Sequence, residues 1–150
     1  MEFSRRLRRH VLEFEKLRLK PEHDEDGALI IGLGRRLDDK GISSDEAYVM
    51  LSNDFEAAHV DMIDIFEHSF YSFPDNIKLV LMDLRLSLGS KEFRRLGGIT
   101  SAARRRQWGL ILREIVNLPW YKKNCLRATA LIRLIDLLIP PPFVNGGTRF

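Results

Sequence analysis

The chain has 150 residues, of which 45% are hydrophobic and 30% are charged. This length and balance suffice for one well-buried core, in one or two small lobes, and they exclude a largely disordered chain. The single cysteine, Cys125, excludes an internal disulfide and a cysteine cluster for structural zinc, so packing alone must hold the fold together.

The positive charge is concentrated in clusters of arginine. The formal net charge is +3 and the sequence pI is about 9.2, with clusters at residues 5–9, 94–95 and 104–106. Such clusters suit an anionic partner, whether nucleic acid, a membrane surface or bacterial wall polymer, and they equally suit the solvent faces of ordinary helices. Charge alone therefore names no partner.

Two targeting classes are not expected. No apolar run approaches the roughly 20 residues that a membrane helix needs, so no stable membrane insertion is predicted. Glu2, Glu13 and Glu15 interrupt the basic N-terminal segment, and no apolar stretch follows it as a secretory signal would require. We therefore expect synthesis in the cytoplasm, with release by another factor or by a non-classical route.

The N-terminal part predicts an amphipathic helix followed by a small β element. Over residues 2–14, apolar side chains recur at helical spacing and arginines occupy the other face. The apolar positions are Phe3, Leu7, Val11 and Phe14. Pro21 and a polar cluster then predict a turn, and a short apolar run bounded by glycine predicts a strand. We predict a small antiparallel hairpin over residues 17–37 and a turn over residues 38–41.

The next part predicts two long helices. Ser43 and Glu46 form a capping box, in which each side chain accepts a backbone N–H of the other residue. The helix that follows should bury one apolar stripe. The stripe consists of Ala47, Leu51, Phe55, Ala58, Met62, Ile65 and Phe66. The second helix, over residues 77–88, is apolar nearly all round and should lie in the middle of the core, ending at Gly89.

Shorter helices are expected in the remainder of the chain. After a break at Gly97 and Gly98, the sequence predicts helical pieces around residues 102–103, 108–116 and 119–123. Asn124 is the expected cap of a last helix that reaches Ile139 and is stopped by prolines. The predicted fold class is therefore α+β and mostly helical.

Glu15 and Asp24 are the candidate catalytic pair. Acid/base cleavage of a glycosidic bond needs one carboxyl group that donates a proton and one ionised carboxylate. Glu15 ends the first helix, where burial against Phe14 and Leu17 would help it to keep a proton, and Asp24 lies in a polar turn and would stay ionised. The plainer interpretation of this spacing is a surface helix end and an Asx turn.

Other chemistries find little support. The turn EHDEDG places Gly27 as an EF-hand requires, but Leu33 falls at the position of the bidentate ligand. The four histidines include no HExxH pair, the segment Gly-Leu-Gly lacks the third glycine of a dinucleotide site, and no GxSxG elbow is present. We expect no metal and no cofactor.

Four segments carry a resemblance to a known family. EFEKLRLKPEHDEDGALIIGLG resembles the opening of the T-even-phage-type lysozymes, glycoside hydrolase family 24, whose pattern is Glu, eight residues, Asp, five residues, Thr, then Gly-x-Gly-His. Three more segments agree in order, namely ISSDEAYVMLSNDFEAA, LMDLRLSLGS and WGLILREIVNLPWYKKNCLRATALI. Together they cover nearly the whole chain up to about Ile139.

The resemblance implies a lysozyme-like fold of two lobes with a cleft between them. It implies one domain over residues 1–139, made of a small β lobe at about residues 16–42 and a helical lobe of residues 1–15 and 43–139. Residues 140–150 would form a C-terminal tail. The implied activity is that of a muramidase, which cleaves the β-1,4 bond between N-acetylmuramic acid and N-acetylglucosamine in peptidoglycan.

The resemblance also assigns roles to individual residues. Glu15 matches the family's general acid and Asp24 its second carboxylate. Arg127 falls on an arginine that faces the catalytic glutamate across the cleft. These assignments imply a peptidoglycan hydrolase that acts in host-cell lysis or wall remodelling, is monomeric and has no nucleic-acid partner.

Three positions depart from the family pattern. Ile30 stands where the family has a catalytic threonine, so it offers no hydroxyl to position water beside Asp24. Arg35 replaces the histidine of Gly-x-Gly-His and is expected to form a structural ion pair with Asp54. Ser87 stands where the family usually has an amide side chain that touches the sugar.

These departures keep two alternatives open. One is a catalytically impaired, lysozyme-shaped protein that binds glycan or a partner without cutting. The other is a small basic helical binder of nucleic acid, for which the sequence has no aromatic and basic stacking platform.

Overall fold

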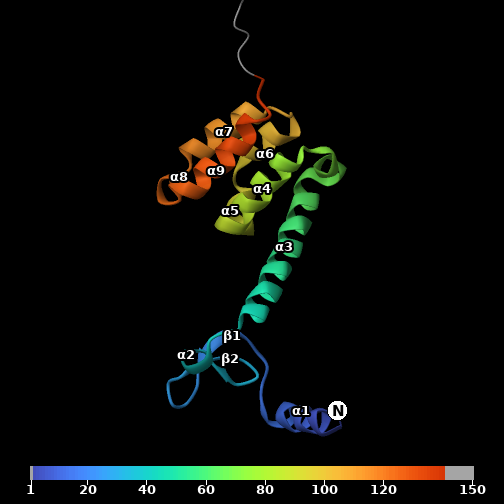
Figure 1. The fold of residues 1–150 in the computed structure, drawn as a ribbon, viewed down its shortest axis with the longest axis vertical. Helices are drawn as coiled ribbons and strands as arrows, with labels where there is room; N and C mark the ends of the chain where they lie inside the picture. Colours follow the sequence, from blue (N-terminus) through green and yellow to red (C-terminus); the bar gives the residue numbers. More distant parts are fainter. Residues whose placement is uncertain (1, 141–150) are drawn as a thin grey trace, which may run out of the picture. The chain divides into compact units, whose positions relative to one another are not determined.

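The structure, a computed structural model, describes residues 2–140 of the chain (Figure 1). These residues are mostly helical, with one small three-stranded antiparallel sheet, so the predicted α+β class is confirmed. The chain divides into two units between Met50 and Leu51. The domain boundaries expected from the sequence stay a prediction, and the tail expected at residues 140–150 lies, from residue 141 onward, outside the described residues.

The first unit contains one amphipathic helix, the sheet and a short helix. Its elements are α1 (Glu2–Phe14), β1 (Arg18–His23), β2 (Leu29–Gly32), β3 (Arg35–Arg36), α2 (Leu37–Lys40) and the start of α3 (Ser44–Phe66). The predicted N-terminal helix is confirmed. The predicted hairpin was incomplete because a third strand, β3, pairs with β2. The turn expected at residues 38–41 was wrong, since α2 occupies most of it and ends at Lys40, with Gly41 as its C-cap at a φ of 57°.

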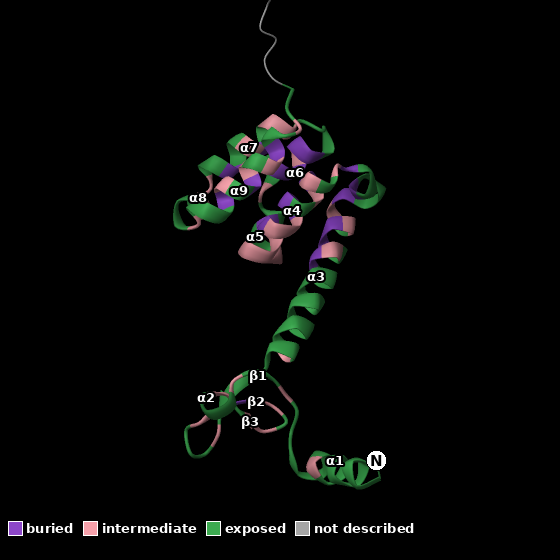
Figure 2. Ribbon diagram, viewed as in Figure 1, coloured by how far each residue is buried: buried purple, intermediate pink, exposed green. Residues whose placement is uncertain are grey.

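The sheet brings three side chains of the first unit to one face. The strand order is β1-β2-β3, and Ile30 on β2 is paired with Glu22 on β1 and with Arg36 on β3. Directly opposed residues of antiparallel strands point to the same face of the sheet. Ile30 is also the one buried residue among those described in this unit, with 6% of its surface exposed. Figure 2 shows how little else is buried there.

The capping box at the start of α3 is confirmed. The Ser43 N–H donates to Glu46 Oε2 at 2.8 Å, and the Glu46 N–H donates to Ser43 Oγ at 3.2 Å. The predicted apolar stripe is confirmed for Ala58 and Met62, which are buried, and wrong for the earlier turns, where Leu51 is 42% exposed. Helical periodicity shows which side chains share a face but not how far along the helix that face is covered.

The second unit is a bundle of helices around one core. From the end of α3 it continues with the 3₁₀ helix η1 (Glu67–Ser72), α4 (Asp75–Leu88), α5 (Ser90–Arg94), α6 (Gly97–Arg104), α7 (Trp108–Asn117), α8 (Pro119–Lys123) and α9 (Cys125–Asp136). As predicted, α4 is central: Ile77, Val80, Leu81 and Leu84 are fully buried. Contacts join α4 to α9, α6 to α7 and α7 to α9.

The last helix begins where it was predicted and ends earlier than predicted. It stops at Asp136 rather than Ile139. Asn124 occupies the predicted N-cap position, but its side chain makes no capping bond; its Nδ2 donates to the Trp120 carbonyl at 3.1 Å.

A polar contact between α4 and α9 gives a stability prediction. Asn76 Nδ2 donates to the Leu134 carbonyl at 3.1 Å in a partly buried position. Asn76→Ala should lower the free energy of unfolding by about 1 kcal/mol, the usual net contribution of such a bond. Urea unfolding followed by tryptophan fluorescence measures this, because Trp108 and Trp120 both belong to the second unit. Asn53→Ala, at an exposed position of α3, is the control, and an equal loss there would contradict the assignment.

Candidate functional site

Glu15 lies directly after α1 and against a glycine turn. Its N–H donates to the Val11 carbonyl at 2.8 Å, and its carboxylate lies 3.5 Å from Arg18 Nη1. A Cβ placed on Gly34 would lie 2.9 Å from Cδ, Oε1 and Oε2 of Glu15, which is closer than real contacts allow. The turn between β2 and β3 therefore lies against the end of the Glu15 side chain, and that flexible side chain would have to shift if residue 34 carried a Cβ.

The expected burial of Glu15 by its apolar neighbours was wrong. Phe14 is 76% exposed and Leu17 is 58% exposed, and the Glu15 side chain itself is 42% exposed. Phe14 lies on α1 and Leu17 follows it in an extended link, so neither ring nor branch folds over the carboxylate. The contacts that hold Glu15 are polar ones.

Asp24 forms the turn between β1 and β2. Its Oδ1 accepts the N–H groups of Asp26 at 3.1 Å and Ala28 at 2.8 Å, and its Oδ2 accepts Arg36 Nη2 at 3.0 Å. The Ala28 N–H, and after it the Arg36 guanidinium, hold the pKa of Asp24 below its ordinary value, since both stabilise the charged form. Asp24 is thus an Asx-turn residue and an ionised carboxylate at the same time.

Arg36 is a site residue that no sequence pattern indicated. Its Nη2 lies 3.0 Å from carboxylate oxygens of both Asp24 and Asp26, and its side chain is 43% exposed. The contact of Arg36 with the two aspartates depends on the strand register that places β3 beside β2. No local pattern in the sequence predicts that register.

Removing Arg36 should raise the pKa of Asp24. In Arg36→Met the cation is lost while the backbone donors remain, so the pKa should move up toward its ordinary value. NMR titration of the Asp24 side-chain carboxyl carbon measures the change. Arg18→Met is the matched control, because Arg18 pairs with Glu15 and Glu22 instead. An unchanged Asp24 titration in Arg36→Met would show that the backbone bonds alone set it.

Arg35 has a different partner from the one expected. Its Nη1 lies 2.6 Å from Glu46 Oε2, where the sequence predicted Asp54. The Ser43 N–H also donates to Glu46. This bond, and to a smaller extent the hydrogen bond from Arg35, lowers the pKa of Glu46. Asp54 lies on α3 eight residues beyond Glu46, which is about 12 Å along a helix axis.

The two site residues expected from the helical unit have partners or surroundings of their own. Arg127 on α9 donates through Nε to both Asp83 carboxylate oxygens at 2.9 Å. Ser87 on α4 has a buried hydroxyl oxygen with no hydrogen-bond partner in the described structure. Their expected approach to Glu15 stays a prediction, as does the cleft between lobes.

A groove of about 1020 Å³ lies within the first unit, but its walls do not suit a sugar. Apolar side chains form most of it, including Leu17, Ile31, Leu33 and Val49, and a few charged groups such as Glu46 complete the lining. Sugar hydroxyl groups need polar partners arranged around them. Neither Glu15 nor Asp24 lines this groove.

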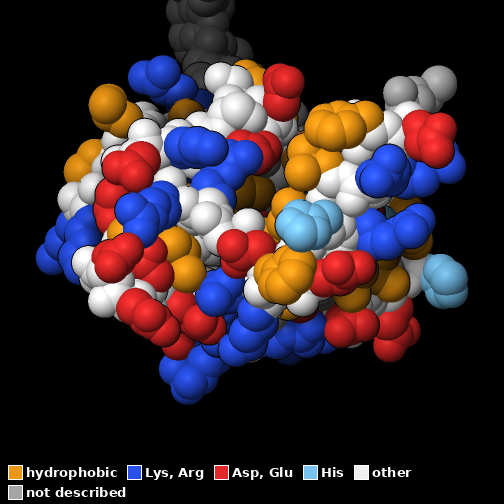
Figure 3. All heavy atoms as spheres, turned by 90° about the horizontal axis from the view of Figure 1, so that it is seen from below, with side chains coloured by type: hydrophobic (Ala, Val, Ile, Leu, Met, Phe, Trp, Pro, Cys, Tyr) orange, Lys and Arg blue, Asp and Glu red, His pale blue; other side chains and the backbone are white. Residues whose placement is uncertain are grey.

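Many arginines of the second unit contact the chain itself. Arg94 pairs with Asp61 and Asp64, Arg104 donates to the Ile65 carbonyl and Arg106 donates to Ser72. In Figure 3, which is seen from the side of the first unit, basic and acidic side chains are interspersed as well. The clusters at residues 94–95 and 104–106 therefore serve internal contacts to a large extent.

Within residues 2–140, no three His, Cys, Asp or Glu side chains are grouped as a metal ion would require. No helix in the same range has the length and apolar character needed to cross a bilayer. Comparison of the chain with protein-family models gives no match, and comparison with curated proteins gives none either.

Proposed function

We propose that this protein is a lysozyme-like peptidoglycan hydrolase. It would cleave the β-1,4 bond between N-acetylmuramic acid and N-acetylglucosamine, after reaching the wall with the help of another factor. The observation that carries the proposal is a pair of carboxyl groups with unlike surroundings in one small unit. Asp24 is bound by three donors that favour its charge, while Glu15 has one cation at 3.5 Å and a glycine turn beside it.

The proposed chemistry gives each carboxyl group one role. Protonated Glu15 donates its proton to the glycosidic oxygen as the bond to the anomeric carbon breaks, and water attacks that carbon from the opposite face with inversion. Asp24 accepts a hydrogen bond from that water and takes its proton as the new bond to the anomeric carbon forms. Three of the roughly four lone-pair positions of a carboxylate are already used, which leaves one on Oδ2 for the water.

The low pKa of Asp24 limits what it can do. A carboxylate held in its charged form is a weak base, so Asp24 would first orient the water and stabilise the positive charge that develops on the sugar, and would take the proton only as the water bonds to carbon and becomes acidic. In this proposal the second unit completes a two-lobed fold and supplies Ser87 and Arg127 to the sugar cleft.

The test is clearing of chloroform-treated Gram-negative cells. Glu15→Gln should lower the clearing rate by at least about 100-fold, the scale of a lost general acid. Glu13→Gln, two residues earlier on α1, is the matched control and should clear as the wild type does. Equal clearing by the wild type and Glu15→Gln would remove Glu15 from the mechanism.

One observation favours a second function, binding without cleavage. Ile30 is 6% exposed and has no hydroxyl group, where the family has a catalytic threonine. If the missing hydroxyl group impairs catalysis in the natural chain, Ile30→Thr should strongly raise the rate of cell clearing. Binding should not change, so wild type and variant should sediment equally with peptidoglycan. Ile31→Thr, on the adjacent position of β2, should have no such effect.

A further inference from the structure

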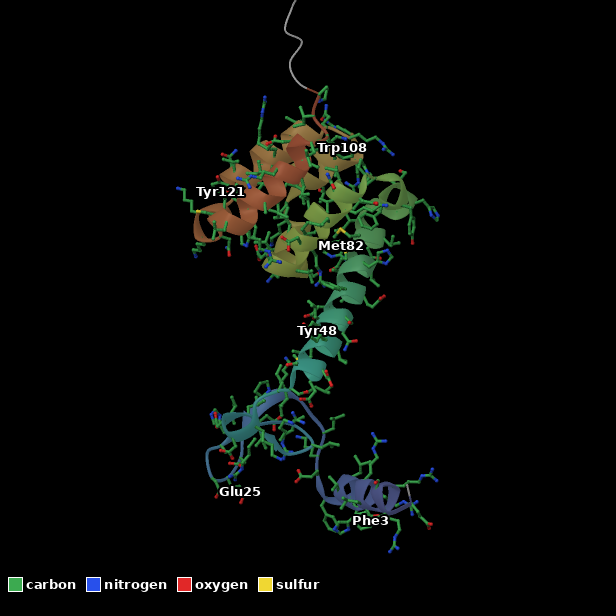
Figure 4. The ribbon with its side chains drawn as sticks, viewed as in Figure 1. Phe3, Glu25, Tyr48, Met82, Trp108 and Tyr121 are labelled. Atoms are coloured by element: carbon green, nitrogen blue, oxygen red, sulfur yellow. The ribbon has the colours of Figure 1, made fainter. Side chains whose placement is uncertain are left out.

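No other described element of the first unit covers the apolar face of helix α1. Phe3 is 75% exposed, Leu7 is 50% exposed and Phe14 is 76% exposed, and no residue of α1 is buried (Figures 2 and 4). Together with Val11 these side chains follow one another at intervals of four, four and three residues, so they form a single stripe. His10 lies at its edge, with its ring centroid 5.0 Å from that of Phe14.

Arginines border and oppose this stripe. At about 100° per residue, Arg6 and Arg8 fall on its two sides, and Arg5 and Arg9 fall on the opposite face. Four arginines and two glutamates give Glu2–Phe14 a formal charge of +2. None of the four forms an ion pair within residues 2–140, whereas Arg85, Arg94, Arg95 and Arg127 of the second unit do.

We infer that α1 binds the surface of an anionic lipid bilayer and lies in the plane of the headgroups. Phe3, Leu7 and Phe14 would enter the boundary of the acyl chains, while Arg6 and Arg8 extend sideways to lipid phosphates. A helix of 13 residues is about 20 Å long, which is too short to span the roughly 30 Å hydrocarbon core. Binding at the surface is the arrangement that its length permits.

The two faces of α1 together favour lipid over nucleic acid. A duplex would contact the arginines through phosphate and leave two phenylalanines and a leucine in water. An anionic bilayer accepts both faces at once, because its phosphates meet the cations and its acyl region takes the apolar stripe. The inference does not depend on the proposed glycosidase activity.

Flotation of the full chain with lipid vesicles tests this inference. Vesicles of phosphatidylcholine with about a third phosphatidylglycerol are compared with pure phosphatidylcholine at near-physiological salt. We expect at least tenfold stronger partitioning to the anionic vesicles, since each arginine near such a surface is worth about a fivefold change. Two variants should each bind the anionic vesicles more than tenfold less strongly. One carries Phe3→Ser with Leu7→Ser, and the other changes Arg5, Arg6 and Arg8 to Gln.

Matched variants control for composition and folding. Leu126→Ser with Leu137→Ser removes two leucines that are 91% and 77% exposed on the second unit, and changing Arg105, Arg113 and Arg133 to Gln removes the same charge as the α1 triple variant. Both controls should bind vesicles as the wild type does. The urea midpoint from tryptophan fluorescence should be unchanged in all four variants.

Four results would overturn the inference. The first two are equal binding to neutral and anionic vesicles, and an equal loss of vesicle binding in the matched controls. The third is binding of a short DNA duplex without vesicle binding, and the fourth is a lowered urea midpoint in the Phe3 and Leu7 variant with no vesicle binding by the wild type. The last result would mean that protein, rather than lipid, covers the stripe.

Discussion

Asp61→Ala should lower the free energy of unfolding of the second unit by about 3 kcal/mol. Asp61 lies on α3 with 7% of its surface exposed, and its Oδ2 accepts Arg85 Nε at 2.7 Å while its Oδ1 accepts Arg94 Nη2. Removing the carboxylate leaves the Arg85 side chain, which is 15% exposed, without its counter-ion. The expected loss of stability lies at the low end of the range for buried ion pairs because the Arg94 side chain is 41% exposed.

Asp64 provides the matched control for this prediction. Its Oδ2 also accepts Arg94 Nη2, at 3.1 Å, but its side chain is 60% exposed. Exposed ion pairs contribute about 1 kcal/mol or less, so Asp64→Ala should have a small effect. Urea unfolding followed by tryptophan fluorescence compares the two variants, and similar losses would show that burial of Asp61 is not what matters.

The ion pairs of Asp61 with Arg85 and Arg94 also predict how stability depends on pH. Burial raises the pKa of Asp61, but the hydrogen bonds from Arg85 and Arg94 outweigh it and hold the pKa below its ordinary value. A carboxyl group with a lowered pKa in the folded state stabilises the fold above its unfolded pKa, which is about 3.9, and this contribution is lost as the pH falls through the folded value. The difference in the free energy of unfolding between wild type and Asp61→Ala should therefore be largest at neutral pH and shrink below about pH 4.

The parts of the fold that the sequence predicted are those with local causes. The helix over residues 2–14 follows from the spacing of its own side chains, and the capping box follows from Ser43 and Glu46 three residues apart. The central position of α4 follows from its apolar character on all sides. Each of these signals lies within a few turns of chain, where periodicity and capping act.

The parts that the sequence did not predict depend on pairing between distant residues. Arg36 reaches Asp24 because β3 pairs with β2, and Arg35 meets Glu46 because the start of α3 follows that strand closely. The sequence placed Glu15 and Asp24 as candidates through spacing and resemblance, but the glycine turn against Glu15 requires the packing of two segments. Spacing along one chain does not contain that information.

Gly34→Ala should lower the clearing activity by about 100-fold if the proposed mechanism holds, because a displacement of about 1 Å at a catalytic group has effects of that size. The new Cβ would lie 2.9 Å from three atoms of the Glu15 carboxyl group, so Glu15 must move. The NMR signal of the Glu15 side-chain carboxyl carbon should shift with it, which tests the contact even in a protein without hydrolase activity.

Gly32→Ala separates displacement of Glu15 from backbone strain. Gly32 has φ +65° and Gly34 has φ +77°, so alanine is strained at both positions, but a Cβ on Gly32 meets no atom within 4 Å. Both variants should therefore lose similar stability, and only Gly34→Ala should move the Glu15 signal and lose activity strongly. Equal losses of activity with an unmoved Glu15 signal would mean that the shape of the turn, and not its contact with Glu15, is what the site requires.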